Sequence, residues 1–319
     1  MILAVDGGGT KTLAVVIDEK KLMVKGIGVA GPSNVRSVTA ITSRKNILKA
    51  VKKARAMAGV KKIDRSIYGI AGYGDSKYHT EELNSIITSI NENAVITNDG
   101  EAAVYLITLG NDGIVTAIGT GSVGAYIKNG KINRIGGWSY LTDDISSGYW
   151  ITRKALEFCE KSYDGLIGDT VLINEFEDYF KLPLRDLVSN LEDHFDKRLM
   201  ASLAIIVNDA ANNGDLIAKE VLRLAYEEIK MMIDGMRKNF DNDVITGSVG
   251  GVMQSEIIKN YLMEKFNDIK IFYGYHVAVG NAMKLLNIND FNIRDKLINE
   301  FNGKISELSR DERDILFIK

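Results

Sequence analysis

The sequence predicts an α/β fold made of two related lobes. Short β-branched runs that are typical of buried strands are mixed with longer segments of helical period. The length of 319 residues corresponds to about two domains. The order strand, Gly/Thr turn, strand occurs at residues 2–18 and again at residues 114–128. Such a repeated unit indicates two lobes of common design.

In the first 110 residues, strands alternate with helices. Residues 12–18 are short and β-branched, which favours a strand, whereas residues 41–58 have Ile, Leu, Val and Ala at helical spacing and a basic opposite face. The expected strands are 2–5, 12–18, 26–30, 65–70 and 95–97, and the expected helices are 41–58 and 100–109.

The remaining chain begins with strands and continues mostly as helix. A strand at 114–118 is followed by a predicted hairpin, 123–128 with 131–135, around Asn129-Gly130, which is a strong two-residue turn signal. The helical pattern of 151–239 is interrupted near Gly165, Pro183 and Gly214. A strand at 244–246 and a helix at 253–266 complete the predicted elements.

Composition is that of an ordinary globular protein. Hydrophobic residues make up 45% and charged residues 26%, with a net charge of −2 and no basic cluster typical of nucleic-acid or anionic-membrane binding. No apolar run approaches the roughly 18 residues that span a bilayer. We therefore expect a cytoplasmic protein without a nucleic-acid or membrane partner. The single cysteine, Cys159, excludes an intrachain disulfide and a cysteine-based zinc site, and is expected to be buried.

The first glycine cluster, Asp6-Gly7-Gly8-Gly9-Thr10-Lys11-Thr12, favours phosphate binding. Glycines let backbone N–H groups approach an anion, and threonine hydroxyls can add to them. The stretch is neither a P-loop, because Thr10 precedes Lys11, nor a Rossmann fingerprint, because a strand follows. Asp6 could hold Mg²⁺ through water. The alternative is a tight structural hairpin. The predicted cofactor-binding residues here are Asp6, Gly8, Gly9, Thr10, Lys11 and Thr12.

Two further glycine clusters suggest the rest of a nucleotide site. Gly119-Thr120-Gly121-Ser122 again combines glycines with hydroxyl-bearing residues, as in the first cluster. One such turn from each lobe could bind a triphosphate from both sides. In Gly247–Gly251, between a strand and a helix, the small residues Gly250 and Gly251 could let adenine pack on the backbone. Each turn also has a purely structural alternative, and for Gly247–Gly251 the two interpretations are equally supported locally.

With these motifs in order, the chain resembles the N-acetylglucosamine kinase and archaeal hexokinase branch of the BadF/BadG/BcrA/BcrD ATPase family, within the actin-like sugar-kinase superfamily. The resemblance covers residues 1–285. Its motifs are Asp6–Thr12, Ala30–Asn34, Gly69–Gly72, Thr97–Asp99, Gly119–Ser122, Gly136–Trp150 and Gly247–Gly251. It implies two actin-like (ribonuclease H-like) lobes with an interdomain cleft, use of ATP with Mg²⁺, and a homodimer.

The same resemblance sets the expected lobe boundaries. The N-terminal small lobe is expected to hold residues 1–110, with the C-terminal segment from about 290 to 319 packing back on it. The large lobe is expected to hold residues 111–289.

For the sugar that accepts the phosphate, similarity to the family's Asn-Asp motif implies that Asp99 is the catalytic base. It follows a strand and opens a helix, where a carboxylate is stabilised by the positive helix end. Phosphoryl transfer needs positioning more than strong basicity, so an aspartate suffices. The alternative is a plain N-cap, for which Asn98 competes. The resemblance implies that Asn98 belongs to the same sugar-binding motif, and that Ser33 and Asn34 contact sugar hydroxyls.

The segment Gly136–Trp150 completes the predicted sugar site. Aligned on Tyr149-Trp150, Asp144 takes the place of the family's sugar-binding aspartate, and Gly137 lies in the matching Gly-Gly-Trp motif. The alternative is that Asp143 and Asp144 cap the following helix. The chain departs from the family pattern at three positions. Glycine is usual in place of Ser139 and of Ser146, and an acidic residue or glycine is usual in place of Ile145.

The resemblance thus implies an ATP-dependent sugar kinase that phosphorylates a hexose or N-acetylhexosamine such as glucose or N-acetylglucosamine, at the 6-hydroxyl. A 2-hydroxyacyl-CoA dehydratase activator is excluded, because its bridging cluster needs four thiolates and this chain has one cysteine. No DNA-binding extension or peptide-binding module typical of related repressors and chaperones is recognised. A nucleotide-binding protein that is non-catalytic or only hydrolyses ATP stays open as the alternative.

Overall fold

The computed structural model describes residues 1–317, which fold into two compact units. The first unit holds Met1–Gly113, Ile127–Lys131 and the chain from Tyr273 onward. The second holds Ile114–Tyr126 and Ile132–Phe272. These described residues form two five-stranded sheets, and the predicted α/β class is confirmed.

The first sheet has the strand order β3-β2-β1-β4-β5. Its antiparallel part joins β1 to β2 and β2 to β3, and its parallel part joins β1 to β4 and β4 to β5. The carboxyl ends of β1, β4 and β5 therefore meet at one edge of the sheet, where Asp6 and Asp99 lie. The strands are β1 (Ile2–Gly7), β2 (Thr12–Asp18), β3 (Met23–Ala30), β4 (Arg65–Ile70) and β5 (Val95–Thr97).

The second sheet repeats this topology. Its strand order is β10-β9-β6-β7-β8. Read from the opposite edge, β8-β7-β6-β9-β10, it is the order of the first sheet with five added to each strand number. The predicted hairpin between β7 and β8 is confirmed, and its turn residues Asn129 and Gly130 have φ of 52° and 73°, as a type I′ turn requires. The strands are β6 (Gly113–Ile118), β7 (Ser122–Lys128), β8 (Lys131–Ile135), β9 (Ile245–Val249) and β10 (Lys270–Phe272).

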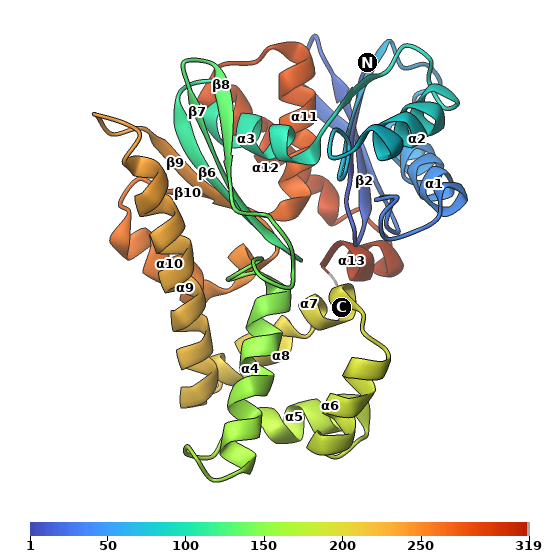
Figure 1. The fold of residues 1–319 in the computed structure, drawn as a ribbon. Coiled ribbons are helices and arrows are strands. Elements are labelled where there is room, and N and C mark those ends of the chain that lie inside the picture. Colours follow the sequence, from blue (N-terminus) through green and yellow to red (C-terminus); the bar gives the residue numbers. More distant parts are fainter. Residues whose placement is uncertain (318–319) are drawn as a thin grey trace. The chain divides into compact units, whose positions relative to one another are not determined.

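Helices cover the first sheet. Helix α1 packs on β2 and β3, and α11 packs on α3 and on β1. Figure 1 shows α1 and α2 on one side of the blue strands and α11 on the other. The helices of this unit are α1 (Ala40–Ala58), α2 (Lys77–Thr88), α3 (Asp99–Thr108), the short 3₁₀ helix η2 (Gly274–His276), α11 (Val277–Leu286), α12 (Phe291–Ile305) and α13 (Arg310–Phe317).

The second unit is mostly helical after its first three strands. The predicted interruptions near Gly165, Pro183 and Gly214 fall between helices, as expected. The predicted helix at 253–266 is divided, because Ser255 starts a new helix by accepting from the N–H of Ile258. The helices are α4 (Gly148–Tyr163), α5 (Leu172–Phe180), α6 (Leu184–Asp193), α7 (Lys197–Ser202), α8 (Ala204–Asn212), α9 (Leu216–Arg237), η1 (Val252–Gln254) and α10 (Glu256–Lys265).

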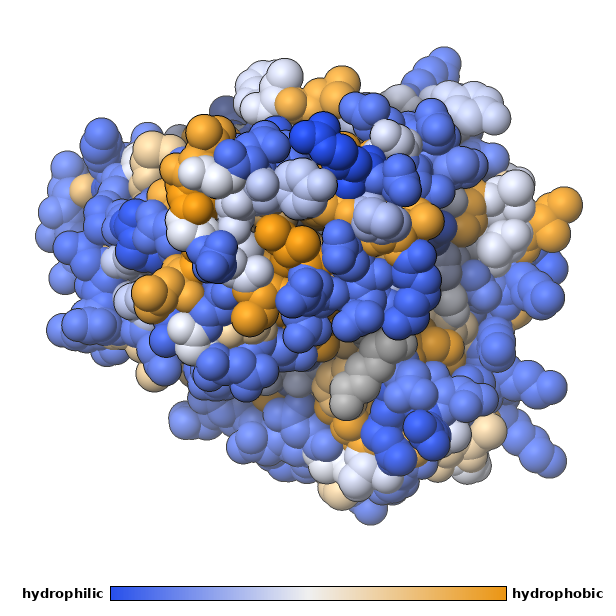
Figure 2. Space-filling view, turned by 90° about the horizontal axis from the view of Figure 1, so that it is seen from below, coloured by the Kyte–Doolittle hydropathy of each residue, from blue (hydrophilic) through white to orange (hydrophobic). Residues whose placement is uncertain are grey.

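The surface matches the composition. On the face shown in Figure 2, hydrophilic residues predominate and hydrophobic ones are interspersed. Among residues 1–317, no helix combines the length and the apolar character needed to cross a bilayer. Cys159 is buried as predicted, and burial raises the pKa of its thiol to about 12, so the thiolate is scarce at neutral pH.

His276 is a buried hydrogen-bonding residue of the first unit. Its Nδ1 accepts from the N–H of Tyr273 at 3.2 Å, which fixes a neutral ring with the proton on Nε2. Nε2 lies 2.8 Å from Asn302 Oδ1 and donates to it. Burial lowers the pKa of His276 to about 4, while Asn302 acts in the opposite direction. His276 is therefore neutral in the folded protein at neutral pH.

We expect His276 to make the fold acid-sensitive. The unfolded chain takes up a proton on this histidine below about pH 6.5, and the folded chain only near pH 4, so the free energy of unfolding falls across that window. The loss is about 2–3 kcal/mol at pH 4.5. Urea unfolding of the wild type and of His276→Gln, which keeps one donor and one acceptor, should show the stability difference shrinking from pH 7 to pH 4.5. A constant difference would contradict the assignment.

Candidate active site

The first glycine turn joins β1 to β2 and is hydrogen-bonded to the predicted sugar-binding turn. The N–H of Gly8 donates to Lys11 O at 2.9 Å. Gly8 O accepts from the N–H groups of Ser33 and Asn34 at 3.1 and 3.2 Å. Thr12 is buried, and its hydroxyl donates to Gly31 O at 2.7 Å. Local strand pairing therefore places the phosphate-binding and sugar-binding candidates of the first unit side by side.

Asp6, Lys11 and Asp99 interact electrostatically in the first unit. Burial, followed by the nearby Asp99 carboxylate, raises the pKa of Asp6 to about 8, and the Lys11 ammonium opposes that shift. Burial lowers the pKa of Lys11 to about 8, with Asp6 acting in the opposite direction. Two carboxylates held near each other disfavour their simultaneous ionisation, so the arrangement attracts a cation.

Lys11 also contacts the C-terminal part of the chain. Its Nζ donates to the carbonyl of Leu316 in α13 and stands 5.8 Å from the centroid of the Tyr275 ring. Helices α12 and α13 both pack on β3, and Lys53 of α1 forms an ion pair with Glu312 of α13 at 2.9 Å. The segment that follows Tyr273 is thereby joined to the sheet that carries the first glycine turn.

The two residues of the Asn-Asp motif have different roles at the start of α3. Asn98 is the N-cap, because its Oδ1 accepts from the N–H of Gly100 at 2.8 Å while its Nδ2 donates to Tyr73 O. Asp99 is the first helical residue, and its Oδ1 also accepts from the N–H of Gly100, at 2.9 Å. The sequence did not decide whether Asn98 or Asp99 is the N-cap of α3, and the structure shows that it is Asn98.

Thr97, just before this motif, anchors the turn to α11. Its hydroxyl donates to Glu101 Oε2 at 2.9 Å and accepts from Lys284 Nζ at 3.0 Å, and Lys284 also pairs with Glu101. Thr97 and Glu101 flank Asp99 in sequence, and their shared contact with Lys284 of α11 fixes the backbone that carries Asp99.

Ser33 and Asn34 follow β3 and lie against the first glycine turn. The Ser33 hydroxyl is buried and has no hydrogen-bond partner among the described residues. Asn34 Oδ1 accepts from the N–H of Arg36 at 2.9 Å. The amide nitrogen of Asn34 and the hydroxyl of Ser33 are thus the polar groups that this turn can offer to a ligand.

The second glycine turn joins β6 to β7 in the second unit. Three hydrogen bonds tie it to residues 144–148: Ser122 N–H to Asp144 Oδ1 at 2.8 Å, Ser122 Oγ to Ile145 O at 2.7 Å, and Gly148 N–H to Gly119 O at 2.8 Å. A further bond, from Gly119 N–H to Gly121 O at 2.8 Å, closes the turn itself. The groups of Ser122 are therefore engaged inside the protein, while Thr120 and Gly121 lie at the tip.

Asp144 is buried and braces this turn. Its Oδ1 lies so close to Gly121 that a Cβ at position 121 would stand 2.5 Å away from it. Its Oδ2 accepts from Lys197 Nζ. Asp144 and Ser146 both have positive φ, 54° and 70°. The latter explains why glycine is usual at position 146, since the left-handed region is disfavoured for residues with a side chain.

The Gly-Gly-Trp segment forms the edge of the same region. Gly137 has φ of 70°, and its carbonyl accepts from Arg134. Asp143 accepts from the N–H of Trp138 at 2.9 Å, so it orders this segment rather than capping α4, whose N-cap is Ser147. The Trp138 side chain is 87% exposed.

The third glycine turn follows β9 and lies against the end of β6. Gly250 has φ of 139°, and a Cβ there would stand 2.0 Å from Ile118 O, so only glycine fits. A Cβ on Gly251 would meet nothing within 4 Å. Because Ile118 directly precedes the second glycine turn, the second and third turns are neighbours in the second unit.

The predicted site residues thus form one group in each unit. The first unit holds Asp6, Gly8, Gly9, Thr10, Lys11, Thr12, Ser33, Asn34, Asn98 and Asp99. The second holds Gly119, Thr120, Gly121, Ser122, Gly137, Asp144, Gly250 and Gly251. Among residues 1–317, no group of three or more His, Cys, Asp or Glu side chains is arranged to hold a metal ion, so a cation at Asp6 would take most of its ligands from water and phosphate.

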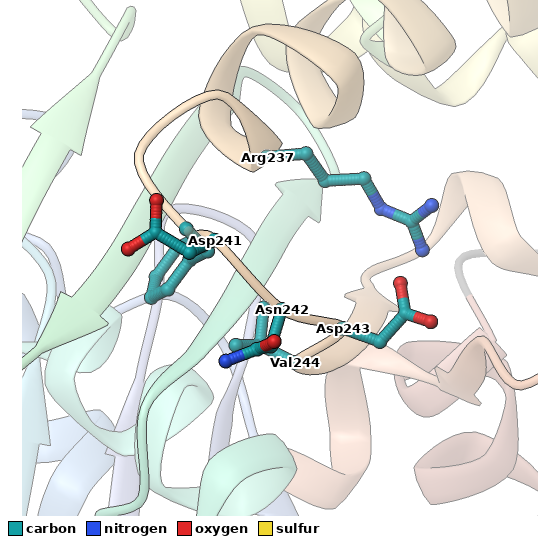
Figure 3. A pocket seen from close by; sticks show the side chains of 6 residues that line it. Arg237, Asp241, Asn242, Asp243 and Val244 are labelled. Atoms are coloured by element: carbon teal, nitrogen blue, oxygen red, sulfur yellow. The ribbon is translucent and has the colours of Figure 1, made fainter.

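A surface pocket of about 440 Å³ contains none of these residues. It is lined by residues at the end of α9 and in the loop before β9 (Figure 3): Arg237, Phe240, Asp241, Asn242, Asp243 and Val244. Asp241 and Asp243 point in different directions, and the Arg237 guanidinium stands 4.8 Å from the centroid of the Phe266 ring. The pocket is polar and open, and it adds nothing to the two groups above.

Two curated proteins are similar to this chain over most of its length. The chain is 30% identical over 283 residues to an N-acetylmuramic acid/N-acetylglucosamine kinase of Clostridium acetobutylicum, covering 83% of this chain and 88% of that protein. It is 24% identical over 302 residues to an N-acetyl-D-glucosamine kinase of Dictyostelium discoideum, covering 83% and 89%.

A solved structure shares the fold: a putative N-acetylglucosamine kinase from Chromobacterium violaceum has a TM-score of 0.72 at 21% identity, covering 90% of this chain and 98% of that one. A glucokinase from Streptomyces griseus, solved with glucose and AMPPNP, has a TM-score of 0.59 at 17% identity, covering 89% and 98%. The family model described as the BadF/BadG/BcrA/BcrD ATPase family matches residues 3–284, and the chain belongs to that family.

Proposed function

We propose that this protein is an ATP-dependent sugar kinase, which transfers the γ-phosphate of ATP to a hydroxyl of a hexose or N-acetylhexosamine. The observation that carries the proposal is the pair of sheets with the same strand order, each with a glycine turn between the corresponding strands, β1–β2 and β6–β7. Family membership and the curated relatives named as sugar kinases support it.

In the proposed mechanism, the nucleotide phosphates bind at the two glycine turns. Thr10 and the amides of Gly8 and Gly9 act in the first turn, and Thr120 and Gly121 in the second. The third turn takes the adenine, because a flat ring can pack on the bare backbone at Gly251. Magnesium, which enters with ATP as part of the substrate, neutralises phosphate charge. Asp6 could contact the magnesium ion through water, because a cation would oppose the burial and the repulsion by Asp99 that raise the pKa of Asp6.

Asp99 is the proposed base. The Asp99 carboxylate, in the first turn of α3 next to the N-cap Asn98, would accept the proton of the sugar hydroxyl as the phosphoryl group arrives. Ser33, Asn34 and Asn98 would orient the sugar, and Asp144 and Gly137 are the candidates for sugar contacts in the second unit. By resemblance, the acceptor is the 6-hydroxyl of glucose or N-acetylglucosamine, and the enzyme is a cytoplasmic homodimer.

A coupled ADP-release assay tests this proposal. Mg-ATP is offered with glucose, N-acetylglucosamine, glucosamine and N-acetylmuramic acid in turn. We expect ADP release to depend on the sugar, with one N-acetylhexosamine or hexose giving the highest kcat/KM. ADP release at one rate with and without every sugar would favour the alternative of an ATP-hydrolysing protein, and no release with any would favour a non-catalytic one.

A further inference from the structure

Lys197 contacts the second glycine turn through Asp144, and nothing in the sequence motifs includes it. It is the first residue of α7, whose N-cap Asp196 accepts from the N–H of Arg198 at 2.8 Å. Its Nζ pairs with Asp144 Oδ2, and its side chain is 31% exposed against 10% for that of Asp144. The ammonium is therefore the main counter-charge of a buried carboxylate.

A cluster of aromatic rings lies beside the Lys197 ammonium. Its Nζ stands 5.8 Å from the centroid of the Tyr140 ring, and Tyr140 stacks on Phe195 with 5.2 Å between centroids. Tyr149 meets both rings edge-on, at 5.8 and 6.0 Å. A cation over a ring and beside a carboxylate has little freedom to move away.

The Asp144 carboxylate lies where it would repel an anion bound at the second glycine turn, and Lys197 offsets its charge. Asp144 is needed at the turn, because its Oδ1 accepts from the N–H of Ser122 and lies against Gly121. Yet a carboxylate there repels an anion bound at the tip of the same turn, and the repulsion is strong where water is excluded. A cation on the other carboxylate oxygen cancels the charge while leaving the hydrogen bond to Ser122 in place.

We propose that Lys197 is a positioning residue for nucleotide binding: it neutralises and orients Asp144, so that the turn Gly119–Ser122 keeps its shape and accepts polyphosphate. This inference rests on the proposed function, since it takes the second glycine turn as a phosphate site. Lys197 acts through Asp144 and need not touch the nucleotide itself.

The test is calorimetric titration of Mg-ADP, without sugar, into the wild type and Lys197→Met. Methionine keeps the apolar stem and loses the charge, so we expect about 10- to 100-fold weaker ADP binding. In the double variant Lys197→Met/Asp144→Asn, the amide oxygen can still accept from Ser122 and the repelling charge is gone. Its ADP affinity is expected to return to within about 3-fold of the wild type.

The matched control is Lys154→Met. Lys154 has the same two kinds of contact in the same unit, an ion pair with Glu157 at 2.7 Å and the Trp150 ring at 5.6 Å, but does not contact the glycine turn. Its loss should leave ADP affinity unchanged. Wild-type affinity in Lys197→Met, or a double variant that binds ADP as weakly as the single one, would overturn the inference.

Failure of the proposed function is read from a different measurement, because a kinase is distinguished from a nucleotide-binding protein without kinase activity by sugar-dependent ADP release. A wild type that binds no ADP would instead contradict the nucleotide site on which this inference rests. Should Lys197→Met alone fail to fold, the double variant still decides, since it carries no buried charge without a partner. A folded double variant that binds ADP supports the inference, and one that is folded but binds none overturns it.

Discussion

Replacing Asp99 with asparagine should lower kcat for sugar phosphorylation by about 10²–10⁴-fold, the usual cost of losing a general base. The amide keeps the size of the carboxylate and can still accept from the N–H of Gly100, but it cannot take the hydroxyl proton. Steady-state kinetics with the best sugar gives the rate, and the KM for ATP should change far less than kcat.

The structure indicates that Asp99→Asn changes the catalytic group with little effect on the stability of the fold. Because Asn98 caps α3, Asp99→Asn should leave the cap in place. It loses the carboxylate's interaction with the helix end, about 0.3–1 kcal/mol of stability, and relieves the repulsion between Asp99 and Asp6. Glu101→Gln is the matched control. It removes a carboxylate charge two residues along the same helix, but its amide oxygen can still accept from Thr97 and Lys284. Its turnover should stay within a few-fold of the wild type. Wild-type turnover in Asp99→Asn would mean that Asp99 is not the base.

Replacing Gly121 with valine should weaken Mg-ADP binding by at least about 10-fold, or about 1.4 kcal/mol. A Cβ at this position would lie 2.5 Å from Asp144 Oδ1, and that carboxylate cannot retreat, because Ser122 and Lys197 hold both of its oxygens. The turn must therefore move, and with it the tip residue Thr120. Calorimetric titration of Mg-ADP measures the change directly.

Gly168→Val serves as the control for the Gly121 variant. Gly168 is exposed in the loop after α4, and a Cβ there meets nothing within 4 Å, so the substitution should leave ADP affinity and melting temperature unchanged. If Gly121→Val binds Mg-ADP with wild-type affinity, the second glycine turn is a structural hairpin, the alternative that the sequence left open.

The fold was predictable where the determining interactions are local. The Asn129-Gly130 turn follows from two residues that tolerate positive φ, and the breaks in the helical stretch follow from Gly165, Pro183 and Gly214. The repeat of the topology was indicated in the sequence only by the strand–turn–strand pattern. The strand order of each sheet could not be predicted, because the pairing of distant strands is not encoded in the local sequence.

The candidate site was predictable only in part. The sequence could not choose between Asn98 and Asp99 as the N-cap, because both side chains can accept from the same backbone N–H. Lys197 was missed altogether: it lies 53 residues from Asp144, in a short helix without any motif, and the contact exists only in the folded chain. Serine itself gives no signal of the positive φ at position 146, and the only indication in the sequence was that the family usually has glycine there.

A sugar kinase passes the γ-phosphate to a sugar hydroxyl and not to water. ³¹P NMR of the reaction with Mg-ATP and the sugar that gives the fastest ADP release distinguishes the two acceptors. We expect one sugar phosphate ester for each ADP formed, with a proton–phosphorus coupling that identifies the 6-position, and little inorganic phosphate. Inorganic phosphate equal to ADP, with no phosphate ester for any sugar of the panel, would contradict it.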